Sequence, residues 1–415
     1  MNKQIRSIFS ILLSTIVFLI GNGLIGVLIP VRASIAGFSH FTIGLIGSAY
    51  FAGFMAGCFT GPRLIARVGH SRTFAVAAGV AAATTLFQSM SLNPVTWIVT
   101  RAAFGVGAAC LYVVIESWLN DRAEPQTRGR IFSYYMVVNY SGLIIGQALF
   151  MSNGASSFTL FNLTAIFYAL CLIPLGLTRQ PQPKPVEVPT LRPLWLFHVS
   201  PVGIGGCIAV GFANAATWTF APIYAQSMGL HRGLLSLFMI LFTLGGALVQ
   251  VPLGRLSDRM DRRYIIAGIG VSAACAGVLV YLFGGHSHTV TLAMGALFGV
   301  VCLPLYGMSV ALVNDRLPRS QFVEASATLL LINSIASILG PPIAASVTEH
   351  FGIASLFLYT ASVHTTLALF TIGRIATHAT GPKVEPENFV AVPVQSSPIA
   401  VELDPRGVSP SVHDA

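Results

Sequence analysis

Charged side chains are scarce in this sequence. Asp, Glu, Lys and Arg together make up 9% of its 415 residues, whereas hydrophobic residues make up 54% and the mean hydropathy is +0.76. A soluble domain typically carries about 25% charged residues, because its surface has to stay hydrated. The shortage of charge therefore excludes an ordinary water-soluble protein and indicates a chain whose main solvent is lipid.

Motifs for enzymatic chemistry are missing as well. The sequence contains no Walker loop, no nucleophile elbow and no zinc-binding HExxH. Its six cysteines all lie inside apolar stretches, which indicates small buried side chains rather than disulfides or metal ligands. We therefore expect neither an enzyme nor an ATP-driven pump, and neither a cofactor nor a bound metal. The net charge of +9 does not indicate a nucleic-acid partner, because the basic residues stand in short loops between apolar runs.

Long apolar runs fill most of the chain. A helix needs about 20 apolar residues to cross a bilayer. The predicted fold is therefore all-α, a polytopic protein embedded in the lipid bilayer with twelve transmembrane helices. The predicted spans cover residues 8–30, 42–66, 73–91, 94–119, 131–151, 157–178, 198–226, 233–256, 264–284, 289–313, 322–346 and 352–375.

The distribution of basic residues predicts the orientation of these spans. With a cytoplasmic N-terminus, the segments on the cytoplasmic side hold 20 of the 23 Lys and Arg residues. The other side holds only Arg32 and Arg232, and Arg101 lies within a span. Lys and Arg accumulate in the cytoplasmic loops of membrane proteins. We therefore expect a multi-pass protein of the bacterial inner membrane with both termini in the cytoplasm.

Two segments lack the membrane pattern. Residues 179–197 contain the Pro-rich run QPQPKPVEVP, which is typical of an extended linker. Residues 376–415 are polar and show no periodic apolar pattern, so they are predicted to form a disordered cytoplasmic tail. The rest of the chain divides into two six-helix bundles, at residues 1–178 and 198–375.

The two bundles repeat one another in sequence. An offset of 192 to 194 residues relates them over five pairs of helices. This predicts two parallel bundles related by an axis along the membrane normal, with a cavity at their seam that rocking exposes to either side. A duplicated bundle without a transport role is the alternative. The matching pairs include Asn22 and Asn214, Pro30 and Pro222, Gly53 and Gly245, Tyr112 and Tyr306, and Asn139 and Asn333.

A charged motif stands between the eighth and ninth predicted spans. Residues 254–263 read Gly-Arg-Leu-Ser-Asp-Arg-Met-Asp-Arg-Arg and resemble the loop signature of the major facilitator superfamily, G-x-L-a-D-R-x-G-R-R, with Asp261 at the second glycine. The copy in the first half has Ala66 in place of the acid. The resemblance extends over residues 8–375 and implies a transporter of that fold. The gating-loop residues that it implies are Arg67, Gly69, Gly254, Asp258, Arg259 and Arg262.

Asp258 has a physical task in this loop. A carboxylate at the end of a helix can pair with a neighbouring Arg and with the positive N-terminus of a helix from the other half. We expect this contact to latch the two halves in the outward-facing state. Because Ala66 replaces the acid in the first half, only the second-half latch is complete. The alternative is a loop charge that only orients the helices.

Two ionisable residues lie inside the fourth predicted span. Arg101 and Glu116 fall on nearly one face of the helix, but they are about 22 Å apart along its axis and cannot pair directly. Ionisable groups within a membrane usually line a cavity. Arg101 is a candidate for coupling or substrate contact, or else is satisfied by carbonyls near the helix end. Glu116 is a candidate proton carrier, or else pairs with Arg128 or Arg130 in an inner charge network.

Both residues stand in runs that resemble the superfamily. The sequence after Arg101 resembles the fourth-helix motif R-x-x-q-G-x-g-a-a, with Phe104 at the glutamine position. In relatives that Arg is often tied to proton coupling, which the resemblance implies for Arg101. The run Glu-Ser-Trp-Leu-Asn-Asp-Arg at 116–122 resembles the YcaD-type branch, which implies no particular substrate. Gln147 stands where drug/proton antiporters carry a proline, so antiport is only weakly indicated.

Polar residues on other predicted helices complete a candidate cavity lining. An Asn in such a helix either faces the cavity or forms an interhelical hydrogen bond worth about 0.6–2 kcal/mol. Both alternatives are open for each Asn here. Besides Arg101 and Glu116, the candidates for substrate contact or coupling are Asn22, Tyr112, Asn139, Tyr140, Asn214, Trp218, Tyr306 and Asn333.

Together these features predict a monomeric secondary transporter. It is expected to move a small organic solute by alternating access, coupled to protons. One Arg and few acids near the predicted cavity disfavour a strongly cationic substrate. An uncoupled facilitator is one alternative. A sensor that binds a solute without moving it is another, although residues 376–415 are too short and irregular for an output domain.

Overall fold

The computed structural model describes residues 3–124, 126–178, 182–183 and 190–377, together with residues 389, 396, 397 and 400. Helices are the only regular secondary structure within this part of the chain. The linker expected at 179–197 and the tail expected at 376–415 therefore lie largely outside the described residues. Where the linker is described, its end forms a short helix, α8 (Pro193–Val199).

The first half contains six membrane-crossing elements, the last of them broken into two short helices. In chain order they are α1 (Lys3–Ile35), α2 (His40–Val68), α3 (His70–Met90), α4 (Pro94–Asp121), α5 (Arg128–Leu149), and the pair α6 (Thr159–Leu170) and α7 (Leu172–Gly176). A 3-10 turn, η1 (Phe150–Ser152), follows α5.

The second half repeats this series after α8. Its elements are α9 (Pro201–Ser227), α10 (Arg232–Arg259), α11 (Arg262–Phe283), the pair α12 (His288–Cys302) and α13 (Leu305–Asn314), α14 (Phe322–Phe351) and α15 (Leu356–Thr377). Short 3-10 turns precede the last two helices, at η2 (Arg319–Gln321) and η3 (Ile353–Ser355).

The twelve predicted spans are confirmed as helical elements, with ends that agree to within a few residues. Eleven of the twelve membrane-crossing elements, with each broken pair taken as one, are long and apolar enough to cross a membrane, and α5 is the one that falls outside this set. Two predicted spans are interrupted in the structure. Span 157–178 breaks at Cys171, between α6 and α7. Span 289–313 breaks at Leu303 and Pro304, because a proline lacks the N–H that would continue the helical ladder.

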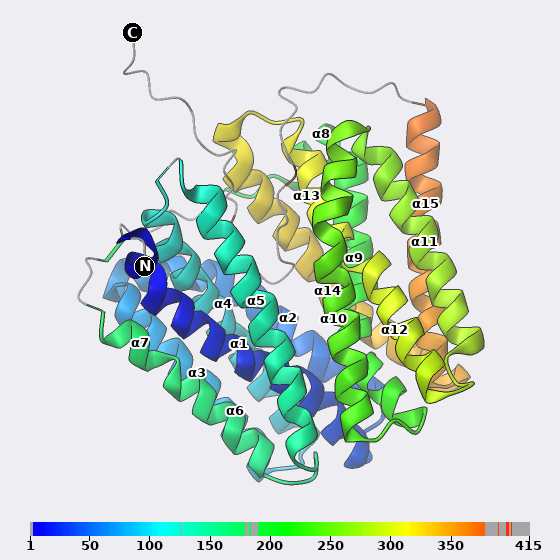
Figure 1. Ribbon diagram of the computed structural model, residues 1–415, viewed down its shortest axis with the longest axis horizontal. Coiled ribbons are helices and arrows are strands. Elements are labelled where there is room, and N and C mark those ends of the chain that lie inside the picture. Colours follow the sequence, from blue (N-terminus) through cyan, green and yellow to red (C-terminus); the bar gives the residue numbers. More distant parts are fainter. Residues whose placement is uncertain are drawn as a thin grey trace.

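Helix pairing reproduces the internal repeat in three dimensions. Within the first half, α1 packs on α5, α2 on α4 and α3 on α6. The second half repeats these pairs as α9 on α14, α10 on α12 and α11 on α15. Close glycine contacts allow some of these approaches, as where Gly57 of α2 lies against α4, with the site of a Cβ 2.6 Å from the carbonyl oxygen of Val106. The two halves stand side by side in Figure 1.

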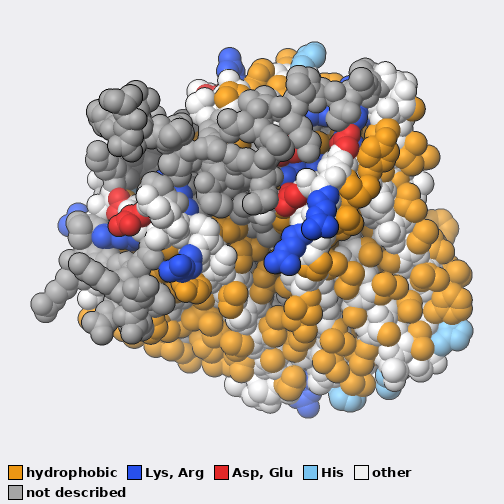
Figure 2. Space-filling model, turned by 45° about the horizontal axis from the view of Figure 1, so that its top comes forward, with side chains coloured by type: hydrophobic (Ala, Val, Ile, Leu, Met, Phe, Trp, Pro, Cys, Tyr) orange, Lys and Arg blue, Asp and Glu red, His pale blue; other side chains and the backbone are white. Residues whose placement is uncertain are grey.

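The two ends of the bundle differ in charge. We call the end where α1 begins and α15 ends the linker face, and the opposite end the far face. Figure 2 shows Lys, Arg, Asp and Glu side chains gathered toward the linker face, while hydrophobic side chains cover the flank below it. The flank is the surface that acyl chains would contact. By the charge rule, the linker face is the one expected in the cytoplasm.

The halves are closed against each other at the far face. Gly44 of α2 lies against the backbone of Pro341 in α14, and His40 Nδ1 lies 3.0 Å from the hydroxyl of Thr348. Buried apolar residues of the first half form one continuous core with the far-face part of the second half. The linker-face part of the second half has a separate apolar core. The halves are therefore joined toward the far face and separated toward the linker face.

Candidate functional site

A cavity of about 170 Å³ lies at the seam between the two halves. Helices α1, α2, α4 and α5 line it from the first half, and α9, α10 and α14 from the second. Of the residues singled out in the sequence, those that line it are Asn22, Arg101, Asn139, Tyr140, Asn214 and Trp218.

Arg101 is the charged residue of this cavity lining. It lies on α4, roughly 10 Å from the far-face end of the helix at 1.5 Å per residue. Its guanidinium carbon stands 4.9 Å from the ring centre of Tyr50 and 5.0 Å from that of Phe104. Each ring offers the electron-rich face that attracts a cation. The close packing of α2 on α4 brings Tyr50 to this position.

The guanidinium lacks the partners that a buried charge usually has. The side chain is 9% exposed, and its Nε and Nη1 atoms have no hydrogen-bond partner. It forms no ion pair with a described carboxylate, and the helix-end carbonyls considered as partners do not accept from Nε or Nη1. A charged residue at the membrane centre costs about 2.5–3.5 kcal/mol even on insertion scales. Arg101 lines the seam cavity, so a ligand bound there would supply a partner for this charge.

Amide groups of the lining are also unpaired. The side-chain nitrogens of Asn22 and Asn139 and both polar side-chain atoms of Asn214 have no partner, although all three residues are buried. Asn22 Oδ1 accepts a weak hydrogen bond from Tyr168 at 3.3 Å. Buried amides left without partners are uncommon in folded proteins. The Asn22 amide lies next to the hydroxyl of Tyr112 and the Asn139 amide next to that of Tyr135. Asn214 is therefore the amide of this lining that is left without a partner at both polar atoms.

Two polar contacts cross the seam beside the cavity. Gln147 of α5 donates from Nε2 to the hydroxyl of Thr243 of α10 at 2.9 Å, and Gln250 Nε2 of α10 donates to Tyr140 of α5 at 2.5 Å. Thr243 and Gln250 are not among the residues expected from the sequence to line the site, nor are Tyr50 and Phe104 among the expected neighbours of Arg101. A signal was present for Gln250, because a glutamine inside an apolar span needs a polar partner.

Three candidates from the sequence lie away from the cavity lining. Tyr112 is buried in the first half, edge-on to Phe18 with ring centres 5.4 Å apart. Tyr306 is buried near the start of α13, and Asn333 is buried on α14. The sequence repeat paired Asn139 with Asn333, but only Asn139 reaches the cavity. The seam is thus less symmetric than the sequence.

Glu116 lies on α4 toward the linker face, outside this cavity lining. It is fully buried, and its Oε1 accepts a hydrogen bond from the hydroxyl of Tyr135 at 2.8 Å. The backbone N–H of Ser397 donates to its Oε2 at 2.8 Å, and the Ser397 hydroxyl donates to the same atom. Among the described ion pairs none joins Glu116 to Arg128 or Arg130. The carboxyl group is therefore held by neutral donors.

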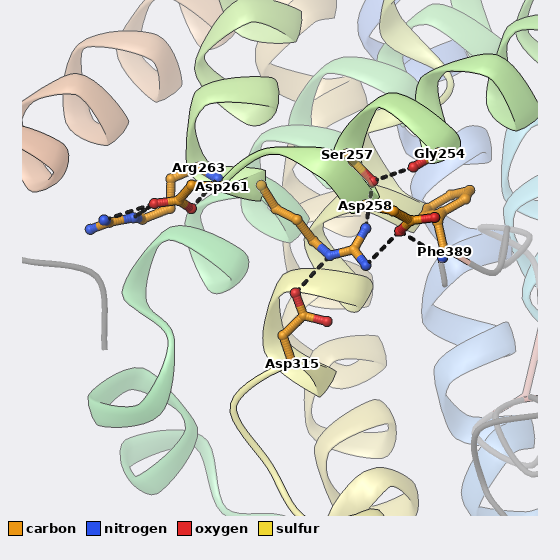
Figure 3. Close-up of polar contacts among 8 residues, drawn as sticks. Gly254, Ser257, Asp258, Asp261, Arg263, Asp315 and Phe389 are labelled. Atoms are coloured by element: carbon orange, nitrogen blue, oxygen red, sulfur yellow. Dashed lines mark hydrogen bonds and ion pairs between the residues drawn. The ribbon is translucent and has the colours of Figure 1, made fainter. Parts of the chain in front are cut away.

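The second-half loop motif forms a buried charge network (Figure 3). Arg262 Nε lies 2.7 Å from Asp315, and Nη2 lies 3.0 Å from Asp258. Arg262 also donates to the hydroxyl of Ser257 at 2.5 Å. Asp258 accepts a further hydrogen bond from the backbone N–H of Phe389 at 2.8 Å. The network ties together α10, α11 and the end of α13 within one half.

The first-half loop has no such network among its described residues. Gly69 joins α2 to α3 with a φ of +84°, a conformation that favours glycine. The position equivalent to Arg262 holds His70, whose Nε2 lies 2.9 Å from the hydroxyl of Ser117. Arg67 stands in the last turn of α2, and Ala66 offers no acid. The charged network is therefore a property of the second half.

Comparison with known proteins gives the family of this chain and its relatives. The sequence profile of the Major Facilitator Superfamily matches residues 11–241 and 204–403. The chain is 24% identical over 384 residues to the uncharacterized MFS-type transporter YcaD of Escherichia fergusonii, covering 92% of this chain and 99% of that protein. YcaD of Salmonella typhimurium is 26% identical over 369 residues, which are 88% of this chain and 94% of that protein.

Solved structures show the same architecture. The nucleoside transporter NupG superposes with a TM-score of 0.72 at 15% identity, covering 91% of this chain and 100% of that one. A D-xylose-proton symporter superposes with a TM-score of 0.70 at 15% identity, covering 92% and 100%. The chain therefore belongs to the major facilitator superfamily. Within it, the chain is a transporter of the YcaD-type branch.

Proposed function

We propose that this protein is a proton-coupled secondary transporter that moves a small organic solute by alternating access. It would act as a monomer in the bacterial inner membrane, with both termini in the cytoplasm. In this proposal Arg101 contacts the solute or takes part in coupling, and Glu116 carries the proton. The observation that carries the proposal is the seam cavity, which holds an unpaired buried Arg101 between two repeated bundles.

The arrangement of the two halves supports this mechanism. The far face is closed by contacts of α2 with α14, and the apolar cores separate toward the linker face. With the linker face in the cytoplasm, this is the inward-facing side of an alternating-access cycle. Two parallel bundles rocking about a fixed central site would produce the other state. The cavity lies where such rocking would leave it in contact with both halves.

Transport itself can be tested without knowing the solute. Purified protein is reconstituted into liposomes and offered a mixture of anionic, neutral and cationic small solutes. Mass spectrometry then measures which of them are retained. We expect at least one solute to enter proteoliposomes on the order of tenfold faster than protein-free liposomes, and faster still under an imposed pH gradient. Entry that ignores the pH gradient would favour an uncoupled facilitator, and no entry of any solute would contradict transport.

Asp258 provides a test of the gating cycle. Losing a latch worth about 1 kcal/mol shifts a two-state population about fivefold, so Asp258→Ala is expected to favour the inward-open state. A cysteine placed at Ser48, which faces α14 at the closed far face, reports opening on that side. Its labelling by a membrane-impermeant maleimide from the far face should fall about fivefold.

The matched control is Asp121→Ala. Asp121 is an acid at the linker face of the first half that lies 3.5 Å from Arg122. The Asp121→Ala variant is expected to leave labelling at position 48 unchanged. Unchanged labelling in Asp258→Ala would contradict the latch and leave Asp258 with a role in orienting the helices.

A further inference from the structure

The charge of the seam cavity is complemented by a hydrogen-bond acceptor. The lining holds Arg101, whose Nε and Nη1 atoms have no partner, and none of the described lining residues is an acid. A guanidinium only donates hydrogen bonds, and the amide of Asn214, whose two polar atoms are also unpaired, can both donate and accept. A carboxylate is the complementary group, because it accepts hydrogen bonds at about four lone-pair sites and donates none when ionised. An ammonium group would bring only donors and a like charge to the same place.

The remaining walls are suited to an apolar body. Tyr50 and Phe104 flank Arg101, and Trp218 lines the second-half side. One water molecule needs about 10–15 Å³ of such space, so a cavity of about 170 Å³ holds a solute of roughly a dozen non-hydrogen atoms. A flat or aromatic solute would pack against the rings of Tyr50 and Phe104 that flank the Arg101 guanidinium.

We propose that the seam cavity binds a small organic anion, a carboxylate with a flat apolar body. Arg101 would bind the carboxylate through two neighbouring N–H groups, Nη2 with Nε or with Nη1, the fork geometry in which Arg differs from Lys. The unpaired amide nitrogen of Asn214 would donate to a further acceptor site. This inference rests on the proposed transport function only in calling the anion a substrate, since the binding site is argued from the cavity alone.

Matched pairs of ligands test the anion directly. Purified protein is heated with benzoate or benzamide, nicotinate or nicotinamide, and phenylacetate or phenylacetamide, with benzylamine as the cation. At least one carboxylate is expected to raise the midpoint of thermal unfolding by several degrees, and its amide is expected to raise it far less. Equal shifts by acid and amide, or shifts by benzylamine alone, or none by any carboxylate, would overturn the proposal.

Arg101 variants then assign the site. Hydrogen bonds to a charged group contribute about 1.5–3 kcal/mol, so Arg101→Gln should weaken the stabilising carboxylate by about 10- to 100-fold. The affinity of Arg101→Lys for this carboxylate should lie between those of the wild type and Arg101→Gln, because lysine keeps the charge and loses the paired geometry. Arg63→Gln, at the linker-face end of α2, is the control that should bind normally. Unchanged affinity in Arg101→Gln would overturn the assignment, and the wild-type ligand pairs decide the anion class if that variant does not fold.

Binding and transport can fail separately. Carboxylate binding without solute flux in proteoliposomes would support the anion site and contradict the transporter. Flux of neutral or cationic solutes without carboxylate binding would support the transporter and contradict the anion site.

A second, independent observation concerns the C-terminal segment at the linker face. Phe389 donates its backbone N–H to Asp258 in the second half, and its ring lies against Gly254 (Figure 3). Eight positions later, Ser397 donates to Glu116 in the first half. Ser396, Ser397 and Ala400 are all buried, at 4% exposed or less. The described residues of this segment thus bind both halves where their apolar cores are separate.

We infer that Phe389 and Ser397 form an autoinhibitory contact between the two halves at the linker face. Ser397 covers the carboxyl group of Glu116, so it must leave before that group can exchange protons with the cytoplasm. Phe389 binds α10 and Ser397 binds α4, whose linker-face ends would have to approach each other in the outward-facing state. Release of these two residues would then be a step that permits the transport cycle.

Cysteine labelling tests whether the segment is docked. Cysteines placed singly at Ser397 and Ala400 are compared with one at Glu124, which is exposed at the linker face, in inverted vesicles, using a membrane-impermeant maleimide and the wild-type protein as background. Labelling at 397 and 400 is expected to be at least about tenfold slower than at 124, because an undocked state that lies about 1.4 kcal/mol above the docked state is populated one tenth of the time. Equal rates at all three positions would overturn the inference.

Removing a docking contact supplies the second measurement. Phe389→Pro removes the N–H that binds Asp258, and Glu116→Ala removes the acceptor of Ser397. Either change should bring labelling at 400 close to the rate at 124. Continued protection in both variants would show that position 400 is buried for another reason and would contradict the docking.

Discussion

Gly53→Ala is expected to destabilise the protein strongly and to lower the yield of correctly packed protein. A Cβ at this position of α2 would overlap the carbonyl oxygen of Ala102 on α4, and a backbone atom in the core of a helix pair cannot rotate away. Overpacking of this kind typically costs about 1–3 kcal/mol and sometimes more. Ala102 follows Arg101, so the displaced α2 would also draw the Tyr50 ring away from the guanidinium. The yield of monodisperse protein and its thermal unfolding midpoint measure the effect.

Gly79→Ala is the matched control for this prediction. Gly79 lies in α3, and a Cβ there would meet nothing within 4 Å. Alanine is favoured over glycine in a helix by about 1 kcal/mol, so this variant should be neutral or slightly stabilised. A Gly53→Ala protein as stable as Gly79→Ala would contradict the close approach of α2 and α4.

Glu116→Gln is expected to abolish accumulation driven by a pH gradient while leaving solute exchange across the membrane. The amide keeps an oxygen acceptor near Tyr135 and Ser397 but cannot take up a proton. The carboxyl group is fully buried and has no described cationic partner, so no neighbouring charge would be left unpaired by the change. The measurement is uptake of a transported solute into proteoliposomes, with and without an imposed gradient, beside counterflow at equal pH.

Asp121→Asn controls for removal of an acid from the same helix. Asp121 lies at the linker-face end of α4, and its side chain is 40% exposed. It should retain uptake driven by the gradient. Wild-type accumulation in Glu116→Gln would contradict a proton-carrying role, whereas loss of both accumulation and exchange would point to a structural role for Glu116.

Several features of the site could be anticipated from single residues. Arg101 could be predicted because a charged residue inside an apolar span is costly and usually lines a cavity. In the structure it does line the seam cavity. Asn22 and Asn214 stood out through their repeat spacing, and both reach the seam. These predictions depend on polarity and chain position, which the sequence states directly.

Other features depended on how each helix is rotated and what packs against it. Tyr112 lies on the same helix as Arg101, yet it points into the first-half core beside Phe18. Tyr50 of α2 reaches the guanidinium because glycines let α2 and α4 approach closely, whereas Phe104 reaches it from the next turn of α4 itself. Helix rotation is set by contacts with neighbouring helices and not by the number of apolar residues in a span.

The sequence by itself determined the lipid environment, the twelve helices and the duplication of the fold. Hydropathy and an offset of 192 to 194 residues are local or additive properties, so they can be counted along the chain. Only the tertiary structure decided that the halves close at the far face, that Arg101 has no partner at Nε and Nη1, and that Ser397 binds Glu116. Each of these depends on groups far apart in sequence, whose meeting is fixed by packing and not by local pattern.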